Sequence, residues 1–347
     1  MATQQSLFSP AELAYLHRSL SLQPPIRPDG RASTQFRPLT AETGVLPGTN
    51  GSARVHFSDG TEAIVGVKAE IEKTAGSADE EQQQQQDDEE RTRGDWLELA
   101  VEIPGQRDDE ASTVFLAEML REALLADKEF AKKLRINRRF HWRLYLDVLL
   151  ISPPLSYPLP LLSLTTHLAL LATRLPRLKS EGDEDPMFDD DWEASTFLYP
   201  REGAGAAGSR PPITLLVVAI GYNTIFDPAK EELAVAETAL AVSVAEVRRV
   251  KGATDMDVDS KARELRLLSI RTVDPPSRLT PPGVPHITNL GAAPTKPKGN
   301  AQATEGVWKA PLGGTKFGVI EGIIQIALEK GGVADEVLDG LEGVELT

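Results

Sequence analysis

Apolar residues recur with two different periods along this chain of 347 residues, and the period predicts where strands and helices lie. Residues 51–71 alternate apolar and polar positions on both sides of Asp59-Gly60. Because glycine adopts positive φ freely, this pattern predicts a β-hairpin. Four more segments have the alternation or the β-branched composition of strands: 96–103, 142–149, 213–220 and 264–273.

Helical spacing of apolar residues predicts a second set of elements. Ser9-Pro10-Ala11-Glu12 forms a capping box with proline at the first helical position, which predicts a helix within residues 1–25. Further helices are predicted at 111–126, 159–173 and 318–332. The first of them is expected to bury one stripe: Val114, Phe115, Met119, Leu120 and Leu124. Residues 229–247 fit either a helix or a strand.

Polar segments divide the patterned regions. An acidic and glutamine-rich insert at about 75–94 is expected to be disordered, because it cannot bury apolar surface. Residues 181–211 are interpreted as a polar linker, and the Pro/Gly-rich stretch 274–313 as another insert. Strands followed by helices occur twice, which predicts an α+β chain with two similar halves, 26–180 and 212–347.

Charge and composition exclude several kinds of protein, among them disulfide-bonded and membrane-spanning ones. The net charge is −15, but residues 76–95 carry −6 and residues 181–193 carry −8, so the rest of the chain is nearly neutral. The acidity therefore does not exclude a basic patch on the core. The chain has no cysteine, and its five histidines are dispersed, so no disulfide, metal or cofactor is expected. No apolar run is long enough for a membrane span, and the first residues do not form a signal peptide, so cytosol or nucleus is the expected compartment.

Two motifs have a chemical interpretation and a plainer one. Residues 203–208 match GxGxxG, but acidic sequence precedes them and Arg210-Pro211-Pro212 follows, so a flexible linker is favoured over a dinucleotide site. Glu231 and Glu232 follow Asp227-Pro228 and could be catalytic acids. Adjacent carboxylates at a helix start are more often solvated charges that the helix dipole favours.

The densest basic cluster consists of Arg135, Arg138, Arg139 and Arg143. Aromatic residues lie among these arginines: Phe140, His141, Trp142 and Tyr145. Guanidinium groups for phosphates and rings for base stacking are the components of a single-stranded RNA site. A basic loop before a buried strand has the same composition, and the arginines could also face a neighbouring protein. They are candidate contacts for RNA or for a partner.

Three segments together resemble one protein family. They are Ile26-Arg27-Pro28-Asp29-Gly30-Arg31, the hairpin GSARVHFSDGTEAIVGVKAE that begins at Gly51, and WRLYLDVLLIS from Trp142, which ATRLPRL follows at 172–178. These segments resemble the RNase PH-like proteins, a family of phosphorolytic 3′→5′ exoribonucleases. Within the family, the chain is most similar to ring subunits of the eukaryotic RNA exosome.

The resemblance implies a fold, an assembly and a compartment. The RNase PH-like fold has two β-α units in a pseudo-twofold arrangement, as in the second domain of ribosomal protein S5. Six such chains form a ring, as heterodimers that assemble into a hexamer, around a channel for single-stranded RNA, and proteins with S1 and KH domains cap the ring. Such subunits serve rRNA maturation and mRNA turnover in the nucleus and nucleolus, and also in the cytoplasm.

The chain departs from the active members of this family in three places. Active members hold phosphate with a Gly-Ser/Thr-rich loop and an arginine, where this chain has Ser152-Pro153-Pro154-Leu155-Ser156-Tyr157-Pro158. They carry paired arginines where Arg107-Asp108-Asp109-Glu110 stands here, and an acid–base aspartate where residues 234–238 offer only Glu237. The resemblance therefore implies a ring subunit without phosphorolytic activity. The alternatives are an active phosphate-dependent exoribonuclease that uses Glu237 and a standalone RNA-binding adaptor.

Overall fold

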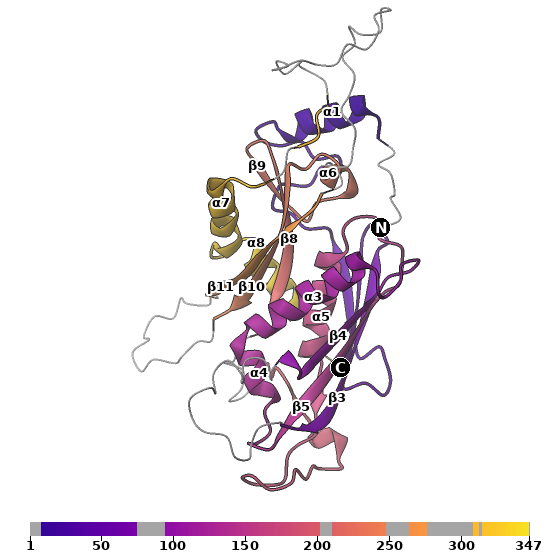
Figure 1. Ribbon diagram of the computed structural model, residues 1–347, viewed down its shortest axis with the longest axis vertical. Helices are drawn as coiled ribbons and strands as arrows, with labels where there is room; N and C mark the ends of the chain where they lie inside the picture. The colour runs from indigo at the N-terminus through magenta and orange to yellow at the C-terminus, as the bar shows by residue number, and fades with distance from the viewer. Residues whose placement is uncertain are drawn as a thin grey trace, which may run out of the picture. The chain divides into compact units, whose positions relative to one another are not determined.

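The computed structural model describes residues 8–74, 94–201, 210–247, 264–275, 308–311 and 314–346, and its elements are labelled in Figure 1. Two compact units are interleaved along the sequence. Unit 1 takes residues 1–36, 216–241 and 271–324, and unit 2 takes the rest. Most of the inserts predicted at about 75–94 and 274–313 lies outside the described residues, namely 75–93, 276–307 and 312–313, and so does the GxGxxG segment at 203–208.

Unit 2 is built on a five-stranded sheet of order β1-β2-β3-β5-β4. Its strands are β1 (Leu39–Thr43), β2 (Gly51–Phe57), β3 (Glu62–Lys73), β4 (Leu97–Glu102) and β5 (Phe140–Leu150). All neighbours are antiparallel except β4 and β5. The predicted hairpin is confirmed as β2–β3, and Gly60 in its turn has φ 90°.

Strand β5 lies inside the sheet, between β3 and β4, and its burial shows whether the basic segment at its start is a surface loop or part of the core. Trp142, Leu144, Leu146 and Val148 are all buried, at most 8% exposed, as the alternation predicts. The opposite parity is more exposed, from Arg143 to Leu149. β5 is therefore a core strand of the sheet, and only the residues before Phe140 remain as an exposed basic loop.

Helices of unit 2 complete its core. α5 (Leu159–Leu171) is buried along its whole length and packs on β2 and β3, while α3 (Ala111–Ala126) packs on β4. Part of the predicted stripe of α3 is wrong, since Val114 and Phe115 are 52% and 43% exposed. Two short helices escaped prediction: α4 (Lys128–Leu134) and α8 (Val333–Glu342).

The second sheet has the order β11-β10-β8-β9. Its strands are β8 (Ile213–Ile220), β9 (Asn223–Phe226), β10 (Thr238–Glu246) and β11 (Leu265–Val273). The ambiguous stretch 229–247 proves to be a short helix α6 (Lys230–Leu233) followed by β10. Mixed sheets with helices agree with the predicted α+β RNase PH-like fold. The unit boundaries fall inside β8, β10 and β11.

The remaining helices agree with the predicted periodicity. α1 (Pro10–Leu20) begins with the capping box, in which the Glu12 backbone N–H donates to Ser9 and the Ser9 N–H donates to the Glu12 carboxylate. α7 spans Phe317–Leu328, and Gly331 beyond its end has φ 66°. No helix within the described ranges combines the length and apolar character that a membrane span requires.

Candidate RNA and phosphate interfaces

The two motif segments that begin at Ile26 and Asp227 meet in unit 1. Arg27 donates two hydrogen bonds to the Glu232 carboxylate, at 2.6 and 2.8 Å, and both side chains are fully buried. The other nitrogen of the same guanidinium donates to the carbonyls of Ala32 and Phe226. Glu232 is therefore a buried partner of Arg27 and is neither a solvated helix charge nor positioned as an acid–base group.

Arg31 makes the second link between these segments. It donates to the Asp227 carboxylate at 2.9 Å and to the Asp29 carboxylate at 2.6 Å. Asp227 is fully buried and has φ 47°, a left-handed conformation that costs free energy for a non-glycine residue. The ion pair and the backbone contacts from Arg27 and Arg31 hold it there. The Arg-Pro-Asp-Gly-Arg motif thus fastens residues 26–31 to the segment around α6.

Glu237 is the carboxylate that the sequence offers in place of an acid–base aspartate. Its Oε1 atom lies 3.0 Å from His17 Nε2 and accepts a hydrogen bond from the Gly221 N–H, also at 3.0 Å. The hydrogen bond from His17 is the largest cause that lowers the pKa of the Glu237 carboxyl below its ordinary value. At neutral pH this group is an ionised acceptor that already has two donors, so it is poorly suited to proton transfer.

The loop 152–158 stands where active relatives are expected to hold phosphate. The structure corrects one expectation, because a guanidinium does reach this loop from elsewhere in the sequence. Arg37 donates to Ser156 Oγ at 3.1 Å, and also to the Asp59 carboxylate at 2.6 Å. The Asp59 charge therefore offsets the positive charge that an anion would need.

The space at this loop is also small. A cavity of about 10 Å³ lies between the loop and α5, lined among others by Arg37, Pro154 and Tyr157. A volume of about 10–15 Å³ on this measure admits a single water molecule, so the cavity has no room for a phosphate ion. Active members of the family are expected to carry paired arginines where this chain has residues 107–110. Arg107 in that segment is exposed, and its guanidinium donates to the Asp109 carboxylate at 2.7 and 2.8 Å.

The candidate arginines fall into three different environments. Arg135 ends α4 and is exposed, and none of the described residues forms an ion pair with it. Arg138 and Arg139 lie on the exposed loop before β5 and pair with Asp183 and Asp185, at 3.8 and 3.0 Å. These acids belong to the stretch that was interpreted as a linker, and sequence spacing gave no signal for the pairing.

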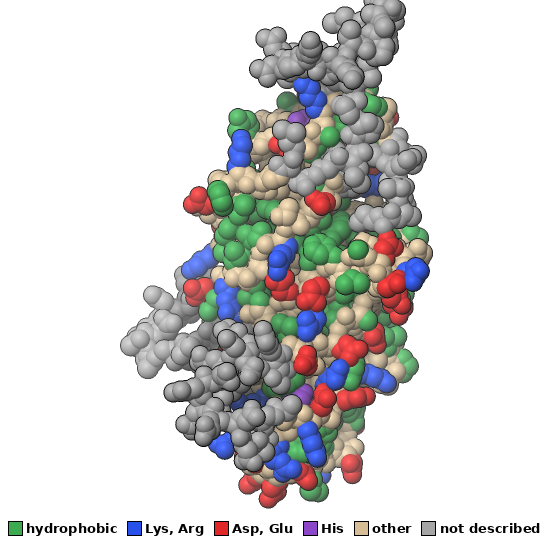
Figure 2. Space-filling model, viewed as in Figure 1, with side chains coloured by type: hydrophobic (Ala, Val, Ile, Leu, Met, Phe, Trp, Pro, Cys, Tyr) green, Lys and Arg blue, Asp and Glu red, His purple; other side chains and the backbone are tan. Residues whose placement is uncertain are grey.

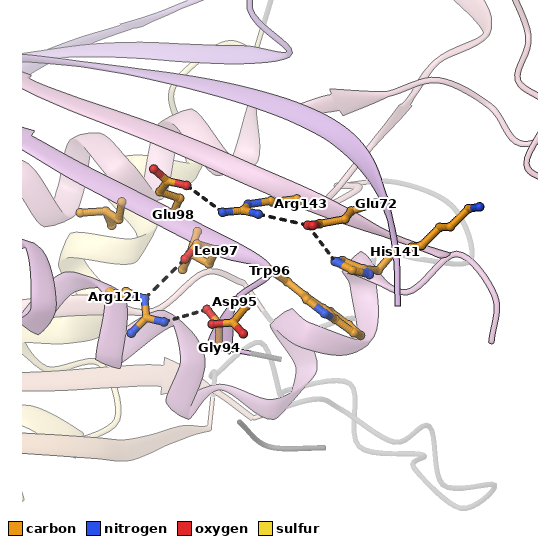
Figure 3. Close-up of a pocket in the computed structure, with 11 residues that line it drawn as sticks. Glu72, Gly94, Asp95, Trp96, Leu97, Glu98, Arg121, His141 and Arg143 are labelled. Atoms are coloured by element: carbon orange, nitrogen blue, oxygen red, sulfur yellow. Dashed lines mark hydrogen bonds and ion pairs between the residues drawn. The ribbon is translucent and has the colours of Figure 1, made fainter. Parts of the chain in front are cut away.

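Arg143 lies on the sheet beside a pocket (Figure 3). Its guanidinium bridges Glu72 on β3 and Glu98 on β4, at 3.2 and 3.0 Å. The pocket holds about 480 Å³ and is lined also by Trp96 and His141, whose rings stack 4.4 Å apart. These two carboxylates offset the Arg143 charge, and the two ion pairs link β5 to its neighbours β3 and β4.

Three of the four neighbouring aromatic rings are closed to base stacking, and the fourth, Tyr145, is half-buried with the Arg143 guanidinium 5.3 Å from its ring centroid. Phe140, His141 and Trp142 are each at most 8% exposed. Burial is the largest cause that lowers the pKa of His141, which keeps the imidazole neutral at pH 7. Figure 2 shows basic side chains lying beside acidic ones over the lower part of the molecule. The exposed arginines at 135–139 therefore offer phosphate contacts without a stacking platform.

Comparisons with known proteins identify the same family that the three motif segments resemble. A family model described as "3′ exoribonuclease family, domain 1" matches residues 35–176. The exosome complex component RRP42 of Saccharomyces cerevisiae is 32% identical over 241 residues, which cover 68% of this chain and 80% of that protein. The corresponding protein of Schizosaccharomyces pombe is 33% identical over 249 residues, covering 67% and 77%. A solved structure, the Archaeoglobus fulgidus exosome with RNA bound to the active site, has 17% identity and a TM-score of 0.48 over 76% of this chain and 87% of that one.

Proposed function

The chain belongs to the RNase PH family of 3′ exoribonucleases, and on that premise we propose that it is a ring subunit of the RNA exosome without phosphorolytic activity of its own. Its role is to complete the ring and to form part of the wall along which single-stranded RNA passes. Relatives named as exosome components match about four fifths of their own length to this chain, which supports the assignment to the ring.

The main support for the absence of phosphorolytic activity is the small cavity at the loop 152–158. Phosphorolysis places inorganic phosphate beside the scissile phosphodiester, so two concentrations of negative charge must share one site. The loop offers a cavity of about 10 Å³, and the nearest guanidinium, of Arg37, is bound by Asp59. A phosphate ion does not fit this cavity, and it would have to compete with Asp59 for the Arg37 guanidinium.

The acid–base position supports the same conclusion. Glu237 is ionised and accepts hydrogen bonds from His17 and Gly221. A general acid needs a proton to give and a raised pKa with which to hold it near neutral pH. The three departures therefore act together: the phosphate loop is closed, the paired arginines are replaced, and the remaining carboxylate is occupied.

The proposal extends to the proteins that bind this chain and to the cellular compartments in which the complex works. We propose that the chain pairs with another RNase PH-like chain in a hexameric ring, that proteins with S1 and KH domains bind the ring, and that the complex works in the nucleus, nucleolus and cytoplasm. Support comes from the family and from the names of the relatives. Affinity purification of the tagged chain from its native cells, followed by mass spectrometry, tests this assembly and rules out the standalone adaptor if ring chains co-purify.

A phosphorolysis assay tests the absence of activity. The full-length chain, alone and with its co-purified ring partners, is incubated with single-stranded RNA and inorganic phosphate, and nucleoside diphosphates are measured. We expect no release that depends on this chain, so Glu237→Gln should not change the rate. Release that Glu237→Gln abolishes would establish the alternative, an active phosphate-dependent exoribonuclease.

A further inference from the structure

Residues 177–189 form a folded element that we call the acidic hairpin. The Lys179 N–H donates to the Met187 carbonyl at 2.7 Å, and the Asp189 N–H donates to the Arg177 carbonyl at 2.9 Å. Gly182, with φ 66°, lies at the turn. The expectation that a polar linker begins at residue 181 is therefore wrong for this stretch, because an ordered hairpin occupies it.

The acidic hairpin has a fixed base and an exposed tip. At the base, the Phe188 ring packs against Trp142 of β5, with ring centroids 5.1 Å apart. At the tip, the side chains of Asp183 and Asp185 are 49% and 76% exposed. Apolar packing therefore anchors the hairpin beside the start of β5, while its carboxylates remain in contact with water.

The tip lies on the loop that carries the candidate arginines, residues 135–139, which we call the arginine loop. The Asp183 carboxylate accepts from the Arg138 backbone N–H at 3.1 Å and lies 3.8 Å from its guanidinium. The Asp185 carboxylate pairs with Arg139 at 3.0 Å. The Asn137 side-chain amide also donates to the Glu184 carbonyl at 2.9 Å.

We propose that the arginine loop binds the phosphate backbone of single-stranded RNA at the positions that Asp183 and Asp185 occupy, so that the acidic hairpin is an internal competitor of RNA. Carboxylates and phosphates bind a guanidinium through the same paired N–H donors, so one replaces the other without rebuilding the loop. This inference rests on the proposed function, which brings single-stranded RNA to the ring.

The strength of these contacts makes the hairpin displaceable. Solvent-exposed ion pairs are individually weak, so two of them lower an opposing affinity by about two- to thirty-fold in total. RNA carries many phosphates and outcompetes two carboxylates at low salt. Because the rings next to the arginine loop, Phe140, His141 and Trp142, are buried, we expect RNA binding through this loop to be independent of sequence and sensitive to salt.

The test compares two double variants of the full-length chain with equal charge. Asp183→Asn with Asp185→Asn removes the contacting carboxylates, whereas Glu181→Gln with Asp190→Asn neutralises two acids that have no described contact with the arginine loop. Binding of a fluorescent oligoadenylate is measured by anisotropy across a salt series. We expect the first double variant to bind RNA about two- to thirty-fold more tightly than the second. Adding Arg138→Gln and Arg139→Gln should abolish that gain.

Three results would overturn the proposal. Equal affinity of the two double variants would mean that only net charge matters. Polyglutamate that competes as well as RNA for the Asp183→Asn, Asp185→Asn chain would assign the loop to an acidic protein segment. An absence of RNA binding in every variant would remove the site, while co-purification of ring partners, measured separately, would leave the proposed function in place.

Discussion

The buried pair of Arg27 and Glu232 gives the sharpest prediction about stability. Both side chains are fully buried, and the carboxylate receives two hydrogen bonds, at 2.6 and 2.8 Å. Glu232→Ala would leave a buried guanidinium with carbonyl oxygens and only the half-exposed Asp29 carboxylate, 3.8 Å away, as an anionic neighbour. Removing one partner of a buried ion pair costs about 3–5 kcal/mol, and we expect the free energy of unfolding to fall by that amount.

The adjacent Glu231 is a matched control, because it lies on the same helix and has no described ion pair. Glu231→Ala should change the free energy of unfolding by no more than about 0.5 kcal/mol. The assay is urea unfolding at neutral pH, followed by circular dichroism, with each variant's midpoint and slope compared to the parent chain. If the free energies of unfolding of Glu232→Ala and Glu231→Ala differ by less than about 1 kcal/mol, the Arg27–Glu232 pair does not stabilise the fold and our account of the motif is wrong.

Two further predictions concern the pH response of unit 1 and the packing of unit 2. The Glu237 carboxyl has a folded pKa below 4.5, so its contact with His17 contributes stability above about pH 4.5 that is lost as the pH falls through the folded value. His17→Gln should therefore lower the melting temperature near neutral pH and lose that effect in acid, as the folded Glu237 carboxyl becomes protonated, and a difference independent of pH would refute this. Gly51→Ala would place Cβ 2.5 Å from Thr173 Cα and should destabilise by about 1–3 kcal/mol, whereas Gly340→Ala in the open part of α8 should raise stability by up to about 1 kcal/mol. Thermal unfolding of the two glycine variants checks the opposite signs.

Elements with a strong and uninterrupted period could be predicted from the sequence. The hairpin β2–β3 and strand β5 follow from alternation and from a turn that needs positive φ, because one buried face fixes the strand register. The α1 capping box is likewise local, since all its contacts lie within three residues. Short elements gave too few positions to establish a period, which explains why α4, with seven residues, was missed.

The site could be predicted only in part, because its decisive contacts join distant segments. Arg27 and Glu232 are 205 residues apart, and Arg37 and Ser156 are 119 apart, so no spacing rule connects them. The acidic hairpin was interpreted as a linker because its charge dominates the local pattern. The Phe188 side chain anchors the hairpin by packing against Trp142, and the sequence alone does not show that these two residues are neighbours.

The interleaving of the two units sets an order of events during synthesis. Arg27 leaves the ribosome well before Glu232, and at roughly 5–20 residues per second a gap of 205 residues takes about 10–40 s. All five strands of the first sheet have been translated within that interval, so this sheet of unit 2 has the earlier chance to collapse. For that time Arg27 lacks its buried partner Glu232, so a ribosome that pauses before α6 would prolong the life of an incomplete unit 1.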